Sequence, residues 1–335
     1  ARLRQAGAVI MGKTVTTEFA FLNPADTSNP HNHAHTPGGS SSGSAAAVAA
    51  GHVPLAIGSQ TNGSTIRPAS FCGIFGYKPT RGMISRTGVL QTSVTLDQVG
   101  VFGRSLQDVC GLADALSGYD PRDPASIPRP MASASAGLIR QPPVEPSIAW
   151  LDLPYHDRLS DDARAGFDDI LAELGDRVER IDAANTVAAL VDHQKSVHEY
   201  EFARHLAGDL NTHWDDISDV LKAAVERGRS YSDAQYAEAL SMVAGAENFF
   251  EEFFHDYDAI LAPSAAGEAP LKTDGTGDPV FCTVWTTAGL PSVNLPLLSG
   301  SAGLPIGVQL IGASEHDDRL MTTAQWLVSA LAGNE

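Results

Sequence analysis

The 335 residues of this chain are 43% hydrophobic and include 31 Gly and 20 Pro, a composition that supports a sizeable core and favours an α/β enzyme over a helical bundle. The 22 Lys and Arg are outnumbered by 40 Asp and Glu, and the formal charge of -18 argues against nucleic acid or anionic membrane partners. No run approaches the roughly 18 apolar residues of a membrane span, and Cys72, Cys110 and Cys282 form no CxxC pair. We therefore expect a cytoplasmic protein with reduced core thiols.

The first part of the chain is expected to alternate short elements with two turns of small residues. Residues 1–6 look like the tail of a helix, and the apolar residues 8–11 predict a short buried strand. The segment 38–51 begins with GGSSSG and continues as an Ala-rich helix closed by a glycine. A buried strand predicted over 53–59 then leads into the second small-residue turn, TNGST, at 61–65.

The rest of the chain is expected to mix strands and helices. Short strands and turns are predicted over 66–104, then a helix over 105–117 with Ser105 as its N-cap. The Pro- and Ala-rich stretch 131–146 is the best linker candidate. Further helices are predicted over 161–174, 185–256 and about 318–332, and further strands over 147–154, 177–182, 257–263, 290–296 and 304–312.

The two small-residue turns have the features of a serine-nucleophile site. Acyl transfer requires a nucleophile, a base and donors aimed at the developing oxyanion. The TNGS run (61–64) follows a predicted buried strand and contains residues that tolerate unusual φ angles, so several N–H groups can face one point. The GGS run (38–40) immediately precedes a helix, whose N-terminus favours negative charge.

Three familiar motifs do not fit these turns. Ile66 stands where a G-x-S-x-G elbow around Ser64 needs its second glycine, and no serine lies three residues before any of the five lysines. The glycines also lack the G-x-x-x-x-G-K-[ST] form of a phosphate-binding loop. The turns therefore predict a serine site of another type.

The sequence resembles the amidase signature family over most of its length. The signature core matches residues 37–104, in GGSSSGSAAAVAAG, IGSQTNGSTIRPASFCGIFGYKPTRG and SVTLDQVGVFGRS. The resemblance begins with GAVIMGKTVTTEFA at residue 7 and returns near the C-terminus in DAILAPSA, TTAGLPSVNLPL and GLPIGVQLIG. It implies one αβα domain over 1–335, built on a mixed sheet with helices on both faces, and a variable helical region on the substrate side at about 120–256.

The resemblance also implies roles for individual residues. In this family the serine of the second turn is the acyl nucleophile, here Ser64. The first serine after the paired glycines, joined through a cis peptide bond, relays its proton and is Ser40 here; the spacing of 24 residues (64 − 40) agrees with the family pattern. The oxyanion hole would consist of the N–H groups of Thr61, Asn62, Gly63 and Ser64. Neither a cofactor nor a metal is implied.

The general base of the family is a neutral lysine, whose pKa burial must lower from its usual value of about 10.4. It lies in a strand upstream of the region matching GAVIMGKT. Lys13 and Lys78 match other, non-catalytic family lysines, in GKT and GYKPT. The opening ARLRQAG also reads as the end of a helix rather than a natural start, so we expect the base in an N-terminal segment outside this chain.

Two positions near the nucleophile bear on substrate binding. The family often has Asp-Thr-Gly-Gly-Ser at the second turn, whereas Gln60 precedes TNGS here, which makes Gln60 a candidate substrate contact. Arg67 follows a subgroup pattern, GS-x-IRPAS, in which the arginine lies near the pocket and can hold a carboxylate or a polar carbonyl bidentately. Burial against a structural carboxylate such as Asp97 explains Arg67 equally well. Asp97 and Arg104 are themselves interpreted as a structural polar pair.

The alternation of His31, His33 and His35 invites a comparison with a zinc site, because the three would project to one side of a strand. No carboxylate or cysteine stands at ligand spacing, and the surrounding NPHNHAHTPGG resembles the ordinary lead-in of the family. We therefore expect no metal here. The aromatic residues within 198–205 and 247–257 are interpreted as helix core.

Together these features predict an amidase that hydrolyses a linear, non-peptide carboxamide or related C–N bond of a small molecule. Small amides, urea-like compounds, carbamates and aryl amides all remain open, and family resemblance makes a homodimer plausible. One rival is the glutaminase (A-type) subunit of a tRNA-dependent amidotransferase, against which Gln60, Asn62 and the acidic surface count. Another is a catalytically inactive binding or scaffold homologue, which a missing lysine would predict.

Overall fold

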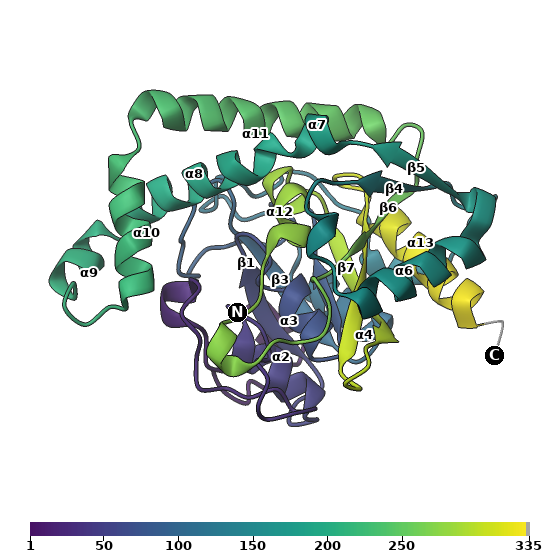
Figure 1. Cartoon of the computed structure of the whole chain (residues 1–335), viewed down its shortest axis with the longest axis horizontal. Coiled ribbons are helices and arrows are strands. Elements are labelled where there is room, and N and C mark those ends of the chain that lie inside the picture. The colour runs from purple at the N-terminus through teal and green to yellow at the C-terminus, as the bar shows by residue number, and fades with distance from the viewer. Residues whose placement is uncertain (333–335) are drawn as a thin grey trace.

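Eight strands form one mixed sheet in the order β1–β3–β2–β7–β8–β6–β4–β5 in the computed structural model, which describes residues 1–332 and, at positions 185 and 186, the backbone alone (Figure 1). All neighbouring strands are antiparallel except β4, which runs parallel to both β5 and β6. The strands are β1 (Ala56–Gln60), β2 (Phe75–Lys78), β3 (Gln98–Gly103), β4 (Ile148–Asp152), β5 (Val178–Asp182), β6 (Ala259–Pro263), β7 (Ser292–Ser299) and β8 (Pro305–Ile311).

Helices cover both faces of this sheet. On β4 the side chains of Ile148 and Trp150 join one hydrophobic cluster, with α4, α6 and α13, while Ala149 and Leu151 join another, with α11 and α12. Because successive strand residues point to opposite faces, the two clusters lie on opposite sides of the sheet. The α-helices are α1 (Arg2–Gln5), α2 (Ser42–Ala49), α3 (Ile66–Phe71), α4 (Leu106–Leu116), α5 (Ala134–Leu138), α6 (Asp161–Leu174), α7 (Ala184–Val187), α8 (Ala189–His205), α9 (Ala207–Thr212), α10 (Asp219–Ser230), α11 (Asp233–Phe253), α12 (Val280–Thr287) and α13 (Asp317–Ala332). The predicted α/β architecture, a central mixed sheet with helices on both faces, is confirmed.

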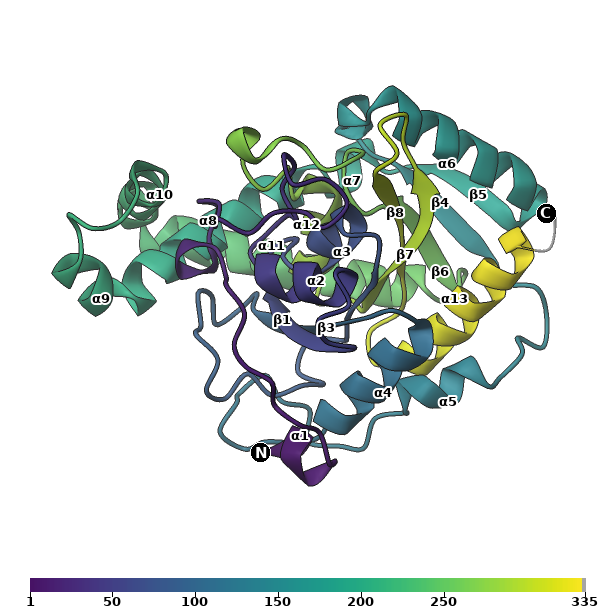
Figure 2. The same ribbon diagram turned by 90° about the horizontal axis from the view of Figure 1, so that it is seen from below.

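The long helices α8 and α11 lie side by side and extend beyond the sheet, and α9 and α10 fold back at their far end (Figures 1 and 2). Phe202 of α8 and Leu206, directly after this helix, pack there with Leu221 of α10 and with Phe21 from the N-terminal segment. The near part of α8 instead packs against α12. The helix α8 therefore connects the outer helices α9 and α10 with the part of the sheet that carries the small-residue turns.

Two facing glycines allow α2, α3 and their preceding turns to lie directly on the sheet. Gly58 of β1 pairs with Gly100 of β3. A Cβ atom at Gly58 would lie 2.5 Å from Ser41 Oγ, and one at Gly100 would lie 2.2 Å from Thr65 Oγ1. Any larger residue would therefore push a turn off the sheet. The glycine pair thus brings the segments around Ser40 and Ser64 to the same patch of the sheet.

Several predicted elements need correction. Residues 8–11 form no strand, and Val9 and Met11 are 81% and 75% exposed, so this apolar segment is not buried. The helices α3 and α12 replace what were expected to be strands, turns or unassigned segments. The linker candidate 131–146 contains α5, which packs against α4 and α13. In the described part of the chain, no helix has the length and apolar character that crossing a membrane requires.

Candidate active site

The segment 60–66, here called the nucleophile turn, joins the end of β1 to the start of α3. The side chain of Gln60 holds its bend, because its Oε1 accepts hydrogen bonds from the N–H groups of Thr65 (2.8 Å) and Ile66 (3.0 Å). Its Nε2 donates to Thr286 Oγ1 of α12 at 2.8 Å. Gln60 is buried, and both ends of its carboxamide form hydrogen bonds with other groups of the protein. Its side chain does not line the neighbouring cavity. Gln60 therefore shapes the turn, and contact between Gln60 and a substrate stays a prediction.

Four consecutive backbone N–H groups of the nucleophile turn have no acceptor among the described residues. They belong to Thr61, Asn62, Gly63 and Ser64, the residues that the sequence assigned to an oxyanion hole. A buried N–H group without a partner costs free energy, so native proteins rarely leave several in a row. Ser64 itself is half-buried, and its hydroxyl has no hydrogen bond to another described residue. The turn thus offers a hydroxyl together with unused donors, as acyl transfer requires.

Ser40 lies in the first small-residue turn, which begins at Gly38, and the Gly39–Ser40 peptide bond is cis. Two contacts hold this turn against the elements that flank the nucleophile turn, β1 and α3. The hydroxyl of Ser41 bonds both backbone groups of Ser59, donating to its carbonyl (3.4 Å) and accepting from its N–H (3.3 Å). The guanidinium of Arg67, one helical turn after Ser64, donates to the carbonyl of Gly39 at 2.7 Å. The cis bond expected from the sequence is therefore present, and Ser40 is buried beside it.

A cavity of about 280 Å³ opens on the nucleophile turn. Thr61, Asn62 and Ser64 line one side of it, and side chains of α8 line the other, among them Lys195 and His198. Two ion pairs, Arg158 with Asp278 and Arg227 with Glu199, also contribute to the wall. Ser40 does not line the cavity, so a molecule bound there would meet Ser64 first.

Comparisons with known proteins identify the family of the chain. The family model described as Amidase matches residues 1–321 of the chain.

The chain belongs to the amidase family.

Three relatives illustrate the similarity. A glutamyl-tRNA(Gln) amidotransferase subunit from Agathobacter rectalis is 32% identical over 365 residues, which cover 96% of this chain and 72% of the relative. A solved structure described as a vestigial protein complex that reveals the evolutionary origins of an s-triazine catabolic enzyme is 28% identical, with a TM-score of 0.91, covering 98% of this chain and 75% of that one. The structure of 6-aminohexanoate cyclic dimer hydrolase complexed with substrate is 27% identical, with a TM-score of 0.85, covering 98% of this chain and 77% of that one.

Arg67 of this amidase-family chain is buried at the wall of the cavity, but not against a carboxylate. Its guanidinium donates to the carbonyls of Gly39, Thr276 (2.8 Å) and Gly277, while its Nε has no partner among the described residues. Burial lowers the pKa of Arg67 to about 10. The suggested pairing with Asp97 is therefore wrong. Contact between Arg67 and a substrate stays a prediction.

Asp97 also does not pair with Arg104, which is exposed and bonds Asp108 through its backbone N–H. Asp97 instead accepts hydrogen bonds from the hydroxyl of Thr61 (2.5 Å) and from the N–H groups of Thr92 (2.7 Å) and Ser93 (3.0 Å). Burial raises the pKa of Asp97, against the lowering effect of these bonds. Asp97 thus fixes the first residue of the oxyanion-hole segment to the loop at 92–97.

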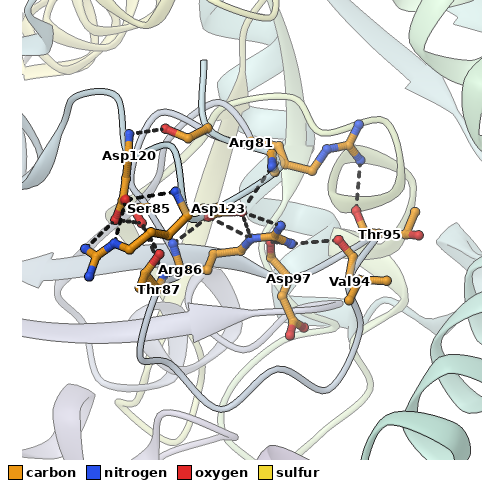
Figure 3. A network of polar contacts seen from close by, with 12 residues as sticks. Arg81, Ser85, Arg86, Thr87, Val94, Thr95, Asp97, Asp120 and Asp123 are labelled. Atoms are coloured by element: carbon orange, nitrogen blue, oxygen red, sulfur yellow. Dashed lines mark hydrogen bonds and ion pairs between the residues drawn. The ribbon is translucent and has the colours of Figure 1, made fainter. Parts of the chain in front are cut away.

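The buried ion pair between Arg86 and Asp123 supports the loop at 92–97 (Figure 3). Arg86 donates to the carbonyls of Val94 (2.7 Å) and Asp97 (3.3 Å), and it forms two-point contacts with Asp123, with distances of 2.7 and 3.1 Å. The side chains of Arg86 and Asp123 are 2% and 0% exposed. Burial alone would raise the pKa of Asp123, but the hydrogen bonds from Arg86 hold it below its usual value. The chain of contacts therefore runs from Asp123 through Arg86 and Asp97 to the nucleophile turn.

Lysine contacts with the two serines are absent among residues 1–332. Lys13 donates to the backbone of Thr14 at the surface. Lys78 is buried in β2, where Nζ donates to Gln98 Oε1 (2.6 Å) and to the carbonyl of Leu290, and burial lowers its pKa to about 7. Neither residue bonds Ser40 or Ser64, so neither lysine is placed to act as their base.

Two of the three histidines of the N-terminal segment form separate hydrogen bonds with the rest of the protein. His31 bonds the carbonyl of Cys72 (3.0 Å) and His35 that of Ala269 (2.6 Å), while His33 is exposed. The segment is not a strand, so the expected alternation on one side is not formed. Among the described residues no group of three His, Cys, Asp or Glu side chains is placed to hold a metal ion. The three cysteines are buried and unpaired.

His198 lines the cavity and packs against the rings of Phe21 and Phe202, with centroid distances of 5.3 and 6.2 Å. Its Nε2 is buried and has no hydrogen-bond partner among the described residues. Burial lowers the pKa of His198 to about 4, because a charged imidazole would lose its solvation there. His198 is therefore neutral in the folded protein above that pH.

This burial predicts a pH-dependent loss of stability. Between about pH 6.5, the usual pKa of His, and about 4, the unfolded chain binds a proton that the folded chain does not. The free energy of unfolding should therefore fall as the pH drops through this window, by on the order of 3 kcal/mol from His198. Urea denaturation of the His198→Leu variant between pH 7.5 and 4.5 should lack this component. The matched variant His205→Leu, at an exposed position of the same helix, should keep the wild-type profile. Identical profiles for all three proteins would contradict the assignment.

The sequence did not reveal the side chains that hold the nucleophile turn from outside the signature core. Gln194 of α8 and Thr283 and Thr286 of α12 all hydrogen-bond Thr61 or Asn62. Thr286 falls in the matched TTAGLP stretch, so a signal existed for α12 alone. Gln194 stands in a helical region without a recognisable motif.

Proposed function

We propose that this amidase-family protein hydrolyses a carboxamide or related C–N bond of a small molecule through an acyl-enzyme on Ser64. The observation that supports this proposal most strongly is the position of Ser64, at the wall of a cavity and within a run of four unused N–H groups. Such preorganised donors stabilise charge that develops on a carbonyl oxygen. A cavity of about 280 Å³ favours a small substrate over a folded protein.

In the proposed reaction Ser64 Oγ attacks the carbonyl carbon while Ser40 takes its proton. The oxyanion forms against the N–H groups of residues 61–64. The C–N bond then breaks, ammonia or an amine leaves with a proton returned through Ser40, and water releases the acyl group by the reverse path. We propose that Ser40 passes this proton on to a lysine base, as in the family that the sequence resembles.

Replacing Ser40 with Ala tests the relay. The variant is expected to lose about 10²- to 10⁴-fold in kcat, the usual contribution of a positioned proton-transfer group. The change should be visible in steady-state hydrolysis, with KM changed much less. Ser42→Ala is a suitable comparison, because its hydroxyl is occupied by the carbonyl of Gly38 (2.7 Å). A Ser40→Ala protein with the same kcat as Ser42→Ala would exclude the relay.

A panel of small amides, aryl amides, carbamates and urea tests the reaction class on the full-length protein. Ammonia or amine release is measured without and with hydroxylamine, which intercepts an acyl-enzyme and yields a hydroxamate. Hydroxamate formation from at least one amide is the expected result. Release of ammonia without any hydroxamate would argue against the acyl-enzyme, and no release from any compound would favour the inactive homologue.

A second function deserves its own test because curated relatives of this chain are named as subunits of glutamyl-tRNA(Gln) amidotransferase. In that case the substrate is glutamine and activity requires partner subunits. Glutaminase activity that appears only after such partners are added would favour this function over a free-standing amidase. Activity on small amides by the isolated full-length protein would favour the amidase.

A further inference from the structure

Each N–H group of residues 62–64 is oriented by a hydrogen bond to the carbonyl that precedes it. In a planar trans peptide the C=O and the next N–H point in opposite directions, so an acceptor bond to one fixes the direction of the other. The carbonyl of Gly63 accepts from the N–H of Arg67 at 3.0 Å, a local bond that begins α3. The carbonyls of Thr61 and Asn62 instead accept from side chains that are distant in sequence.

Gln194 of α8 holds the first of these peptides. Its Nε2 donates to the carbonyl of Thr61 at 3.0 Å, which fixes the direction of the Asn62 N–H. Its Oε1 accepts from Nδ2 of Asn62 at 3.2 Å, so both ends of the carboxamide act on the same turn. Gln194 is 2% exposed, so water cannot replace these bonds easily.

Thr286 of α12 holds the second peptide. Its hydroxyl donates to the carbonyl of Asn62 at 2.5 Å, which fixes the direction of the Gly63 N–H. The same hydroxyl accepts from Gln60, and its rotation is therefore set. Thr283, one helical turn earlier, donates to Oδ1 of Asn62 at 2.7 Å. Asn62 is thus bound by α8 on one side of its carboxamide and by α12 on the other.

We infer that Gln194 and Thr286 are positioning residues that aim the Asn62 and Gly63 N–H groups at the oxyanion. This inference rests on the proposed acyl transfer at Ser64. Thr286 does not line the cavity, whereas Gln194 does, but both bond a backbone carbonyl of the nucleophile turn and act on the oxyanion through it. The consequence is that α8, which also lines the substrate cavity, sets part of the catalytic geometry. Substitutions on α8 that shift Gln194 will therefore alter kcat as well as substrate binding.

Two pairs of variants of the full-length protein test the inference. Gln194→Met keeps the length of the side chain without its hydrogen bonds, and Gln194→Glu keeps the acceptor while placing an oxygen against the Thr61 carbonyl. Thr286→Val removes the hydroxyl, and Thr286→Ser restores it. Gln325→Met, on the distant α13, is the matched control for the glutamine change. For each protein, kcat and KM are measured per active site, with sites counted by stoichiometric labelling of Ser64 with a fluorophosphonate.

The loss of one oxyanion donor typically costs about 10²- to 10³-fold in rate, and misaimed donors should cost less. We expect Gln194→Met and Thr286→Val to lower kcat per labelled site by about 10- to 100-fold, with KM within about 3-fold of wild type. Thr286→Ser should recover most of the rate. A merely structural role would reduce the number of labelled sites and leave kcat per site unchanged, and that result would overturn the inference alone. A wild-type protein with neither turnover nor labelling would overturn the proposed function and this inference together.

Discussion

The Ser64→Ala variant of the full-length protein is expected to lose at least about 10⁴-fold in kcat while keeping its fold and its substrate affinity. The loss follows because the variant keeps the N–H groups of residues 61–64 but lacks the hydroxyl that would form the acyl-enzyme. Stability should change little, since the Ser64 hydroxyl makes no hydrogen bond with another described residue. Ammonia release gives kcat, and thermal unfolding checks the fold.

The control for this variant is Ser329→Ala, at a surface position of α13. It should retain the full wild-type rate. Retention of more than about a tenth of the wild-type kcat by Ser64→Ala would mean that another group attacks the substrate. In that case the nucleophile turn would be a binding feature only.

The second large effect concerns stability, and it arises at Asp123. Asp123→Ala leaves the guanidinium of Arg86 buried without its carboxylate, and breaking a buried pair in this way costs about 3–5 kcal/mol. Arg86 also holds the carbonyls of Val94 and Asp97, so the loop that anchors Thr61 should loosen as well (Figure 3). Chemical denaturation of wild type and variant measures the change in the free energy of unfolding.

A neighbouring ion pair provides the comparison for Asp123. Arg122 pairs with Asp120 only two residues away, but its side chain is 73% exposed. Arg122→Ala is therefore expected to leave the denaturation midpoint almost unchanged. An equally small change for Asp123→Ala would show that the buried pair does not support the loop.

The sequence predicted the parts of the fold that local pattern decides. The small-residue turns, the helix capped by Ser105 and the strand over 257–263 follow from turn chemistry, capping and a short apolar run, and all three are found. The buried strand predicted over 8–11 was wrong, because a short apolar segment does not reveal whether another part of the protein covers it.

The sequence predicted the site residues that lie in family motifs, but not the contacts that residues distant in sequence make with them. Family motifs pointed to Ser40, Ser64 and the run 61–64, because all of these residues lie within the signature core, 37–104. The ion-pair partners predicted for Arg67 and Asp97 were wrong. Both residues bond backbone or hydroxyl groups, which a pattern of charges in the sequence does not identify. Gln194 was not predicted for the same reason. It lies 133 residues from Thr61 in the sequence and contacts the nucleophile turn through the two ends of its carboxamide.

The measurement that tests the central claim most directly is covalent labelling of the full-length protein with a fluorophosphonate, followed by peptide mapping. Such a reagent reacts with an activated serine and leaves a phosphonyl oxygen in the oxyanion hole. We predict one adduct per chain, located on Ser64 and absent from Ser64→Ala. An unlabelled Ser64, or an adduct on a different serine that persists in Ser64→Ala, would contradict the assignment of Ser64 as the nucleophile.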